Sequence, residues 1–104
     1  MTQEELLSRV KVAVHEVAPG ASVWLYGSRA RGTAGPDSDW DILVLVSGPV
    51  TEQRRQAIRH RLYEVEWATD TVLSSIIHSS SEWSRPPLSA TPFHKSVSKD
   101  AIPI

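Results

Sequence analysis

The sequence S-V-W-L-Y-G-S-R-A-R-G-T-A-G-P-D-S-D-W-D-I-L-V-L-V, from Ser22 to Val46, decides the fold of this chain. It predicts a short strand, a Gly-Ser turn, a basic and Gly-rich connection, and a second strand that opens with two carboxylates. Asp39 and Asp41 are two residues apart, and residues two apart in a strand share a face, so the two acids project side by side. The apolar run that starts at Ile42 lacks alternation, which is typical of a strand buried on both faces.

Two carboxylates on one face at the end of a strand indicate a metal site. Like charges repel and lose hydration in a core, whereas a hard divalent cation such as Mg²⁺ or Mn²⁺ prefers oxygen ligands and leaves room for phosphate oxygens. Gly27 lets the backbone approach a ligand closely. Ser28 offers a hydroxyl and is a predicted N-cap for a short helix, whose free amides favour phosphate. The pattern therefore predicts a nucleoside triphosphate site, with Asp39 and Asp41 on the metal and Gly27 and Ser28 on the phosphates.

Two arginines lie in the segment that would meet the phosphates. Arg29 and Arg31 are candidate nucleotide-binding residues, and the ordinary alternative for each is a solvated surface arginine. The residues from Gly27 to Gly32 also fit the spacing G-x-x-x-x-G. However, Thr33 follows where a Walker A loop has lysine, which excludes a P-loop.

Gly27-Ser28, ten further residues and Asp39-x-Asp41 together resemble the signature of the nucleotidyltransferase superfamily related to DNA polymerase beta. The fuller string Y-G-S-R-A-R-G, followed by D-S-D-W-D, resembles its small stand-alone members, the minimal nucleotidyltransferase (MNT) domains. The resemblance implies a metal-dependent enzyme that binds Mg²⁺-ATP and transfers a nucleoside monophosphate to an acceptor hydroxyl, releasing pyrophosphate. It also implies a partner, because MNT domains often pair with HEPN ribonuclease-type toxins and some inactivate them by adding AMP to a tyrosine.

The same resemblance implies a third carboxylate, on a strand that faces the first two acids. The strand predicted from Thr71 to His78 carries no acid on either face. Asp70, directly before it, is the nearest candidate for the third catalytic acid. The alternative is that Ser74 occupies the place of that acid, which would put catalysis in doubt while leaving nucleotide and metal binding intact.

The rest of the sequence predicts helices around these strands. Residues 2–17 form an amphipathic pattern in which Thr2 and Glu5 make a capping box. A second helix is predicted from Thr51 to about residue 67, and shorter helical segments follow residue 79 and the Thr91-Pro pair. The order helix, strand, strand, helix, strand and small helices predicts an α/β fold, with a small mixed sheet flanked by helices as in polymerase-beta-type domains.

Length and composition restrict the class of protein. At 104 residues the chain is expected to form a single domain over 1–104. Lys and Arg number 11 against 12 Asp and Glu, a balance that does not suggest broad nucleic-acid binding. The absence of cysteine excludes disulfides and a cysteine nucleophile. The acidic N-terminus and the lack of a membrane-length apolar run predict a cytoplasmic protein without membrane association.

Two other function classes stay open on sequence alone. One is a nucleotide-binding pseudoenzyme, which the missing third acid would explain. The other is an interaction module that neutralises a partner by contact. The apolar C-terminus, with Ile102 and Ile104, either folds back or forms an interface, and an oligomer is possible. The second helix has a basic face that is either solvated or a docking surface for an acidic partner: Arg54, Arg55, Arg59, His60 and Arg61.

Overall fold

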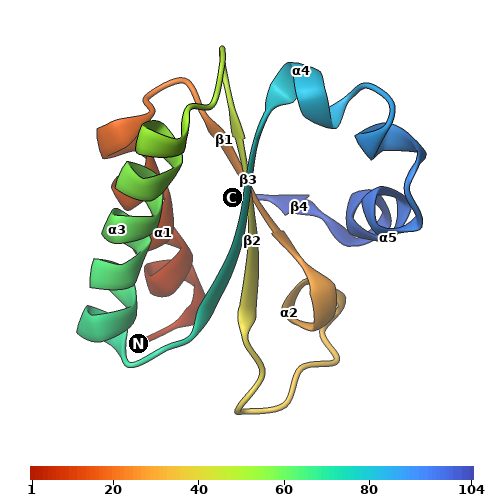
Figure 1. Cartoon of the computed structure of the whole chain (residues 1–104). Coiled ribbons are helices and arrows are strands. Elements are labelled where there is room, and N and C mark those ends of the chain that lie inside the picture. Colours follow the sequence, from red (N-terminus) through yellow and green to blue (C-terminus); the bar gives the residue numbers. More distant parts are fainter.

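A four-stranded mixed sheet separates two layers of helices in the computed structural model, which describes residues 1–104 (Figure 1). The elements follow in the order α1 (Gln3–Val17), β1 (Ser22–Tyr26), α2 (Gly27–Arg31), β2 (Trp40–Val46), α3 (Glu52–Thr69), β3 (Leu73–Ser79), α4 (Ser80–Trp83), a 3₁₀ turn η1 (Leu88–Ala90), α5 (Pro92–Asp100) and β4 (Ile102–Pro103). The strand order is β3-β2-β1-β4, with β2 and β3 parallel and the other pairs antiparallel. The predicted α/β fold with a small mixed sheet flanked by helices is confirmed.

Strand β2 is buried on both faces, as its unbroken apolar run predicts. Helices α1 and α3 cover one face, and α2, α4 and α5 lie on the other (Figure 1). Ile42, Val44 and Val46 point into the larger core, under α1 and α3. Leu43 points the other way, into a smaller cluster with Trp83 of α4 and Val97 of α5. Alternate residues of β2 therefore face different layers, and the odd-numbered ones face α4 and α5.

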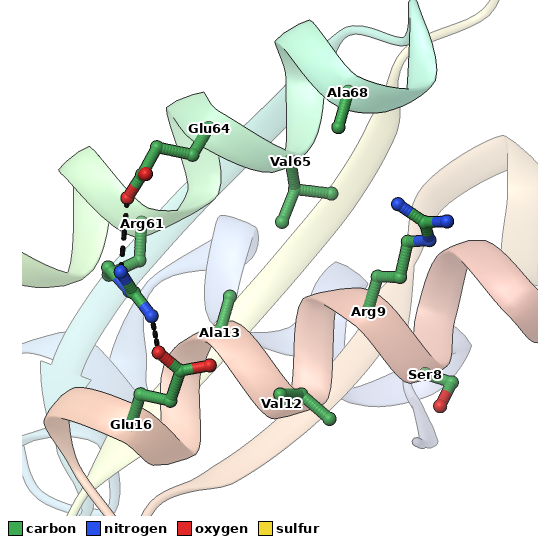
Figure 2. Close-up of a pocket in the computed structure, with 9 residues that line it drawn as sticks. All are labelled: Ser8, Arg9, Val12, Ala13, Glu16, Arg61, Glu64, Val65 and Ala68. Atoms are coloured by element: carbon green, nitrogen blue, oxygen red, sulfur yellow. Dashed lines mark hydrogen bonds and ion pairs between the residues drawn. The ribbon is translucent and has the colours of Figure 1, made fainter.

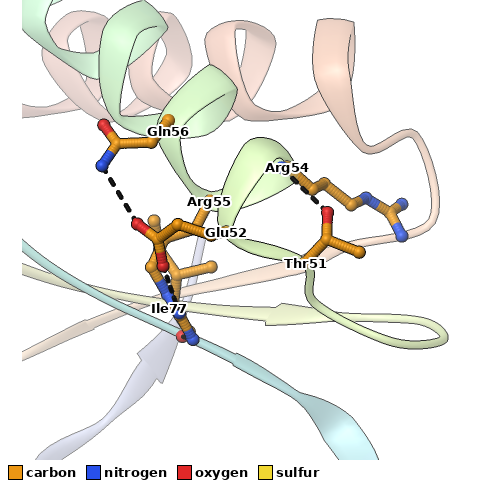
Figure 3. A network of polar contacts seen from close by, with 6 residues as sticks. All are labelled: Thr51, Glu52, Arg54, Arg55, Gln56 and Ile77. Carbon is orange, nitrogen blue, oxygen red and sulfur yellow. Dashed lines mark hydrogen bonds and ion pairs between the residues drawn. The ribbon is translucent and has the colours of Figure 1, made fainter.

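The predicted helix starts are confirmed by their capping bonds. The hydroxyl oxygens of Thr2, Thr51 and Thr91 accept hydrogen bonds from the backbone N–H groups three residues later, each at 3.1 Å. Figure 3 shows the start of α3, where Arg55 also donates to the backbone oxygen of Ile77 at 3.1 Å. This bond ties the first turn of α3 to β3, the outermost strand on that side of the sheet.

Two local predictions were wrong, and one strand was not predicted. The strand predicted from Thr71 to His78 spans Leu73–Ser79, because α3 runs to Thr69 and Asp70 then turns the chain in the left-handed region (φ 52). Ser28 is not an N-cap, because α2 starts one residue earlier, at Gly27. The last residues form an unpredicted strand, β4, that pairs with β1.

The C-terminal end folds back along β1. Ile102 lies opposite Leu25, and the N–H of Ile104 donates to the backbone oxygen of Val23 at 2.9 Å. Ile104 also packs against the larger core. Of the two alternatives for the apolar end, the structure thus has the folded-back one. None of the helices combines the length and the apolar composition that crossing a membrane requires.

Candidate functional site

The start of β2 meets the start of α2 at one end of the sheet. Asp41 lies opposite Tyr26 on β1 and opposite Ser74 on β3. A Cβ atom added to Gly27 would lie 2.3 Å from Oδ2 of Asp41, which is closer than unbonded atoms can approach. Gly27 also has φ +73, where side chains are strained. Position 27 therefore favours glycine for two reasons. The backbone has a positive φ, and the Asp41 carboxylate, which is predicted to bind the metal, occupies the space that a Cβ atom would need.

Burial and neighbouring charges shift the pKa of the Asp41 carboxylate. Burial raises the pKa of Asp41, the charge of Asp39 raises it further, and the charge of Arg31 lowers it. Asp39 and Arg31 thus both lie within electrostatic range of Asp41. Burial, followed by the charge of Asp41, raises the pKa of Tyr26 to about 12, so this phenol stays protonated in neutral solution. The prediction that both acids open the strand was wrong in one respect, because β2 begins at Trp40 and the exposed Asp39 precedes it by one residue.

The donor set here suits magnesium. In proteins Mg²⁺ is commonly held by one or two carboxylates, with waters and substrate phosphates completing its octahedron. Asp39 and Asp41 supply two carboxylates, and their mutual repulsion is the kind that a cation relieves. No third His, Cys, Asp or Glu joins them in a group that could hold a metal ion by protein ligands alone.

Arg31 and Ser28 lie on the short helix next to these acids. Arg31 forms an ion pair with Asp100 of α5, with 2.5 Å between Nη1 and Oδ2. Ser28 is the second residue of α2, and its carbonyl accepts the N–H of Gly32. Because α2 begins at Gly27, the N–H groups of Gly27 and Ser28 lie in its first turn, where backbone N–H groups have no partner within the helix.

Arg29 and Asp70 are placed elsewhere. The Nη2 atom of Arg29 donates to the backbone oxygen of Ser38 at 2.8 Å, and its guanidinium lies 4.2 Å from the ring centroid of Trp40. Asp70 lines a hollow of about 180 Å³ together with Arg29 and Trp40. Trp40 and Asp41 are adjacent in a strand and point to opposite faces. The structure therefore groups Gly27, Ser28, Arg31, Asp39 and Asp41, and it places Arg29 and Asp70 beside Trp40.

Ser74 occupies the position on β3 next to Asp41. The two residues are register partners in the parallel β2–β3 pair, so their side chains share a face, and Ser74 is exposed. Ser74 is one of the two residues, with Asp70, that the sequence offers for the place of the third acid, and it carries a hydroxyl.

Two residues near the site were not predicted from the sequence to belong to it. Phe93 of α5 is 53% exposed and lies edge-on to Tyr26, with 6.4 Å between ring centroids. Asp100 lies 69 residues from Arg31 in the chain. One sequence signal could have revealed Asp100: a negative charge in the last turn of a helix opposes the helix dipole, and such a residue needs a cationic partner.

The hollow between α1 and α3 is lined by none of the predicted site residues. It has a volume of about 320 Å³, and Figure 2 shows Arg61 beside it, paired with Glu16 and Glu64. On the same basic face, Arg54 lies near the backbone oxygens of Ser47 and Pro49, and Arg55 bonds to β3. His60 lies 3.9 Å from Glu64, so four of the five basic side chains on α3 contact the chain itself, which lends little support to a docking surface.

Comparisons with known proteins bear on the family of this chain. A family model described as a nucleotidyltransferase domain matches residues 6–103. "Probable protein adenylyltransferase MntA" of Haemophilus influenzae is 29% identical over 70 residues, which make up 65% of this chain and 61% of that relative. The chain thus matches about three fifths of the relative's length.

A solved structure supports the same fold. It is described as "Crystal structure of the toxin-antitoxin with AMP-PNP", and it matches 98% of this chain and 72% of its own with a TM-score of 0.62. The sequence identity is 18%, so this likeness bears on the fold alone. With the family model matching nearly the whole chain, the protein belongs to the nucleotidyltransferase domain family.

Proposed function

We propose that this protein transfers AMP from Mg²⁺-ATP to a hydroxyl group on a partner protein, and that a HEPN-type toxin is the candidate partner. One observation carries the proposal: the Asp41 carboxylate lies directly against Gly27, with Asp39 and Arg31 in electrostatic range. The relative described as a probable protein adenylyltransferase supports AMP transfer to a protein, and the resemblance to MNT domains suggests the kind of partner.

Each residue of the site has a role in this proposal. Asp39 and Asp41 would hold the metal, which when bound neutralises charge on the phosphates. The backbone N–H groups of Gly27 and Ser28 and the guanidinium of Arg31 would bind phosphate oxygens. The acceptor oxygen forms a bond to the α-phosphorus, the bond from that phosphorus to the bridging oxygen breaks, and pyrophosphate leaves. The hydroxyl proton passes to water or to a nearby carboxylate.

The test joins a binding measurement with a transfer measurement. We expect calorimetry to detect Mg²⁺-ATP binding by the wild type and to show a severe loss in Asp41→Asn, which keeps the shape but removes the charge. Incubation of the co-purified partner with Mg²⁺-ATP should add the mass of AMP to it, and Asp41→Asn should abolish that gain. Unchanged Mg²⁺-ATP affinity in Asp41→Asn would contradict the site assignment.

A second candidate function is nucleotide binding without transfer. Ser74 lies beside Asp41 and is one of the two candidates for the place of the third acid; the hydroxyl that it carries there favours this alternative. Tight Mg²⁺-ATP binding with no mass gain on a verified partner would support it.

Asp70 is the other candidate for the third acid, and its left-handed backbone makes asparagine the suitable replacement, because Asn tolerates this conformation. If Asp70 acts as a catalytic acid, Asp70→Asn should lower transfer while ATP binding is kept. The contacts of Arg29 favour instead a role for it in holding the loop before β2, and Asp70 lines the same hollow as Arg29.

A further inference from the structure

The ion pair between Arg31 and Asp100 joins the nucleotide-facing helix to the last helix of the chain. The Nη1 atom of Arg31 on α2 lies 2.5 Å from Oδ2 of Asp100 on α5. The two partners differ in exposure: the Asp100 side chain is 12% exposed and the Arg31 side chain 49%. Asp100 is therefore fixed against the protein, whereas much of the guanidinium-bearing side chain faces solvent.

We propose that Asp100 is a positioning residue for the triphosphate, holding Arg31 in the orientation in which its free N–H groups meet the phosphates. This inference rests on the proposed function and adds a residue to its site. It also gives the two arginines different roles. Arg31 would bind the ligand, whereas Arg29 donates to the backbone oxygen of Ser38 and stacks on the ring of Trp40.

The geometry leaves Arg31 able to bind while it is paired. A guanidinium has five N–H donors, and the pair with Asp100 is made through Nη1. Arg31 lies on α2, whose first residue, Gly27, packs against the Asp41 carboxylate, so the guanidinium belongs to the same end of the sheet as the acids. Arginine loses much rotamer freedom when it is immobilised by a ligand, and a partner that immobilises it beforehand removes part of that cost.

Two other roles for Asp100 are possible on chemical grounds. As a third metal ligand it would need to lie with Asp39 and Asp41, and no such group of three is present. As a competitor it would neutralise Arg31 and weaken phosphate binding. The competitor role predicts the opposite sign of effect, since removing the charge of Asp100 would then tighten Mg²⁺-ATP binding.

The experiment measures the affinity of the full chain for Mg²⁺-ATP and for AMP, together with thermal stability. We expect Asp100→Asn to weaken Mg²⁺-ATP about two- to tenfold, the range expected when one flexible side chain must be ordered on binding. The affinity for AMP should change less, because AMP lacks the outer phosphates. Asp100→Glu should restore part of the loss.

A double variant shows whether Asp100 acts through Arg31. The combination Arg31→Gln with Asp100→Asn should bind Mg²⁺-ATP no more weakly than Arg31→Gln alone, because the two residues act as a unit. A matched control is Glu52→Gln, which removes the carboxylate partner of Arg55 at 3.3 Å on the far layer and should leave nucleotide affinity unchanged (Figure 3).

The outcomes separate this inference from the proposed function. If the wild type binds Mg²⁺-ATP and Asp100→Asn binds it equally or more tightly, the positioning role is overturned and the proposed function stands. Equal weakening of ATP and AMP, additive with Arg31→Gln, also overturns it, because that pattern indicates a general loss of structure. A wild type that binds no Mg²⁺-ATP overturns the proposed function and this inference together.

Discussion

Gly27 shows how one residue can serve the backbone and the site at once. Its φ of +73 is a conformation that glycine adopts without strain, and the Asp41 carboxylate occupies the space where a side chain would lie. From the sequence, glycine is expected to give room for phosphates. In the structure the room is filled by the residue that would hold the metal, so the position of the metal ligand itself depends on Gly27.

Gly27→Ala tests whether the position of Asp41 depends on Gly27, and Gly32→Ala is the matched control. Both glycines have positive φ, +73 and +77, but a Cβ on Gly32 meets nothing within 4 Å. We expect Gly32→Ala to lower the free energy of unfolding by about 1–2 kcal/mol through backbone strain alone. Gly27→Ala should cost more, since Asp41 must move, and it should also weaken Mg²⁺-ATP binding. Urea unfolding and calorimetry measure the two effects, and equal behaviour of the two variants would refute the role of the Asp41 contact.

Strand β3 determines what stands opposite the acids. Ser74 shares a face with Asp41, whereas Ser75 points to the α3 layer. Ser74→Asp adds a carboxylate to the site and Ser75→Asp adds one to the opposite face, so the two variants form a matched pair. If a general base is what the site lacks, Ser74→Asp should raise the rate of AMP transfer by up to about 10²–10⁴-fold. Ser75→Asp should not raise it, and similar rates for both variants would argue against a missing acid at this position.

Helices α4 and α5 are held against the sheet through an aromatic stack. The ring of Trp83 lies 5.9 Å from that of His78 and 4.3 Å from that of His94, and Nδ1 of His78 is buried without a hydrogen-bond partner. Burial lowers the pKa of His78 below its ordinary value of 6.5; the charge of Arg55 lowers it further, and Glu82 opposes the shift. Protonation of His78 is therefore unfavourable in the folded protein.

This shift predicts how stability depends on pH. The unfolded chain takes up the proton near pH 6.5 and the folded chain only at lower pH, so folding stability decreases as the pH falls below about 6.5. His78→Phe keeps a stacked ring and removes the titration. Between about pH 7.5 and about pH 5.5, the wild type should lose more free energy of unfolding than His78→Phe in urea titrations. An equal loss in both proteins would show that His78 does not titrate differently on folding.

The sequence predicts elements well where the signals are local. The caps at Thr2, Thr51 and Thr91 and the apolar run of β2 each depend on neighbours in the chain, and all four are confirmed. Strand β4 has two residues, too few for any periodicity, and it forms only because β1 offers it a partner.

The candidate site also contains residues that the local sequence predicts and residues that it does not. Asp39, Asp41 and Gly27 follow from a short motif, and the structure brings them together. Long-range contacts decide the rest. Stacking on Trp40 takes Arg29 to the loop before β2, and a bond across 69 residues joins Arg31 to Asp100.

At the scale of the whole molecule, the site connects parts of the chain that are far apart in sequence. It combines the end of β1, the first turn of α2, the start of β2 and, through Asp100, the end of α5. A ligand that binds all of these in the folded state, and none in the unfolded chain, stabilises the fold by mass action.

Mg²⁺-ATP should therefore raise the melting temperature markedly. At a ligand concentration about a hundredfold above Kd the gain is about 2.7 kcal/mol, which for a domain of this size corresponds to about 10–20 °C. ATP with EDTA should give a much smaller shift, because the charges of Asp39 and Asp41 then repel the phosphates instead of binding them through the metal. Mg²⁺-ATP should leave Asp41→Asn nearly unshifted. Differential scanning fluorimetry measures all three, and a shift in wild type that persists undiminished in EDTA would show that nucleotide binding does not depend on a metal at these two acids.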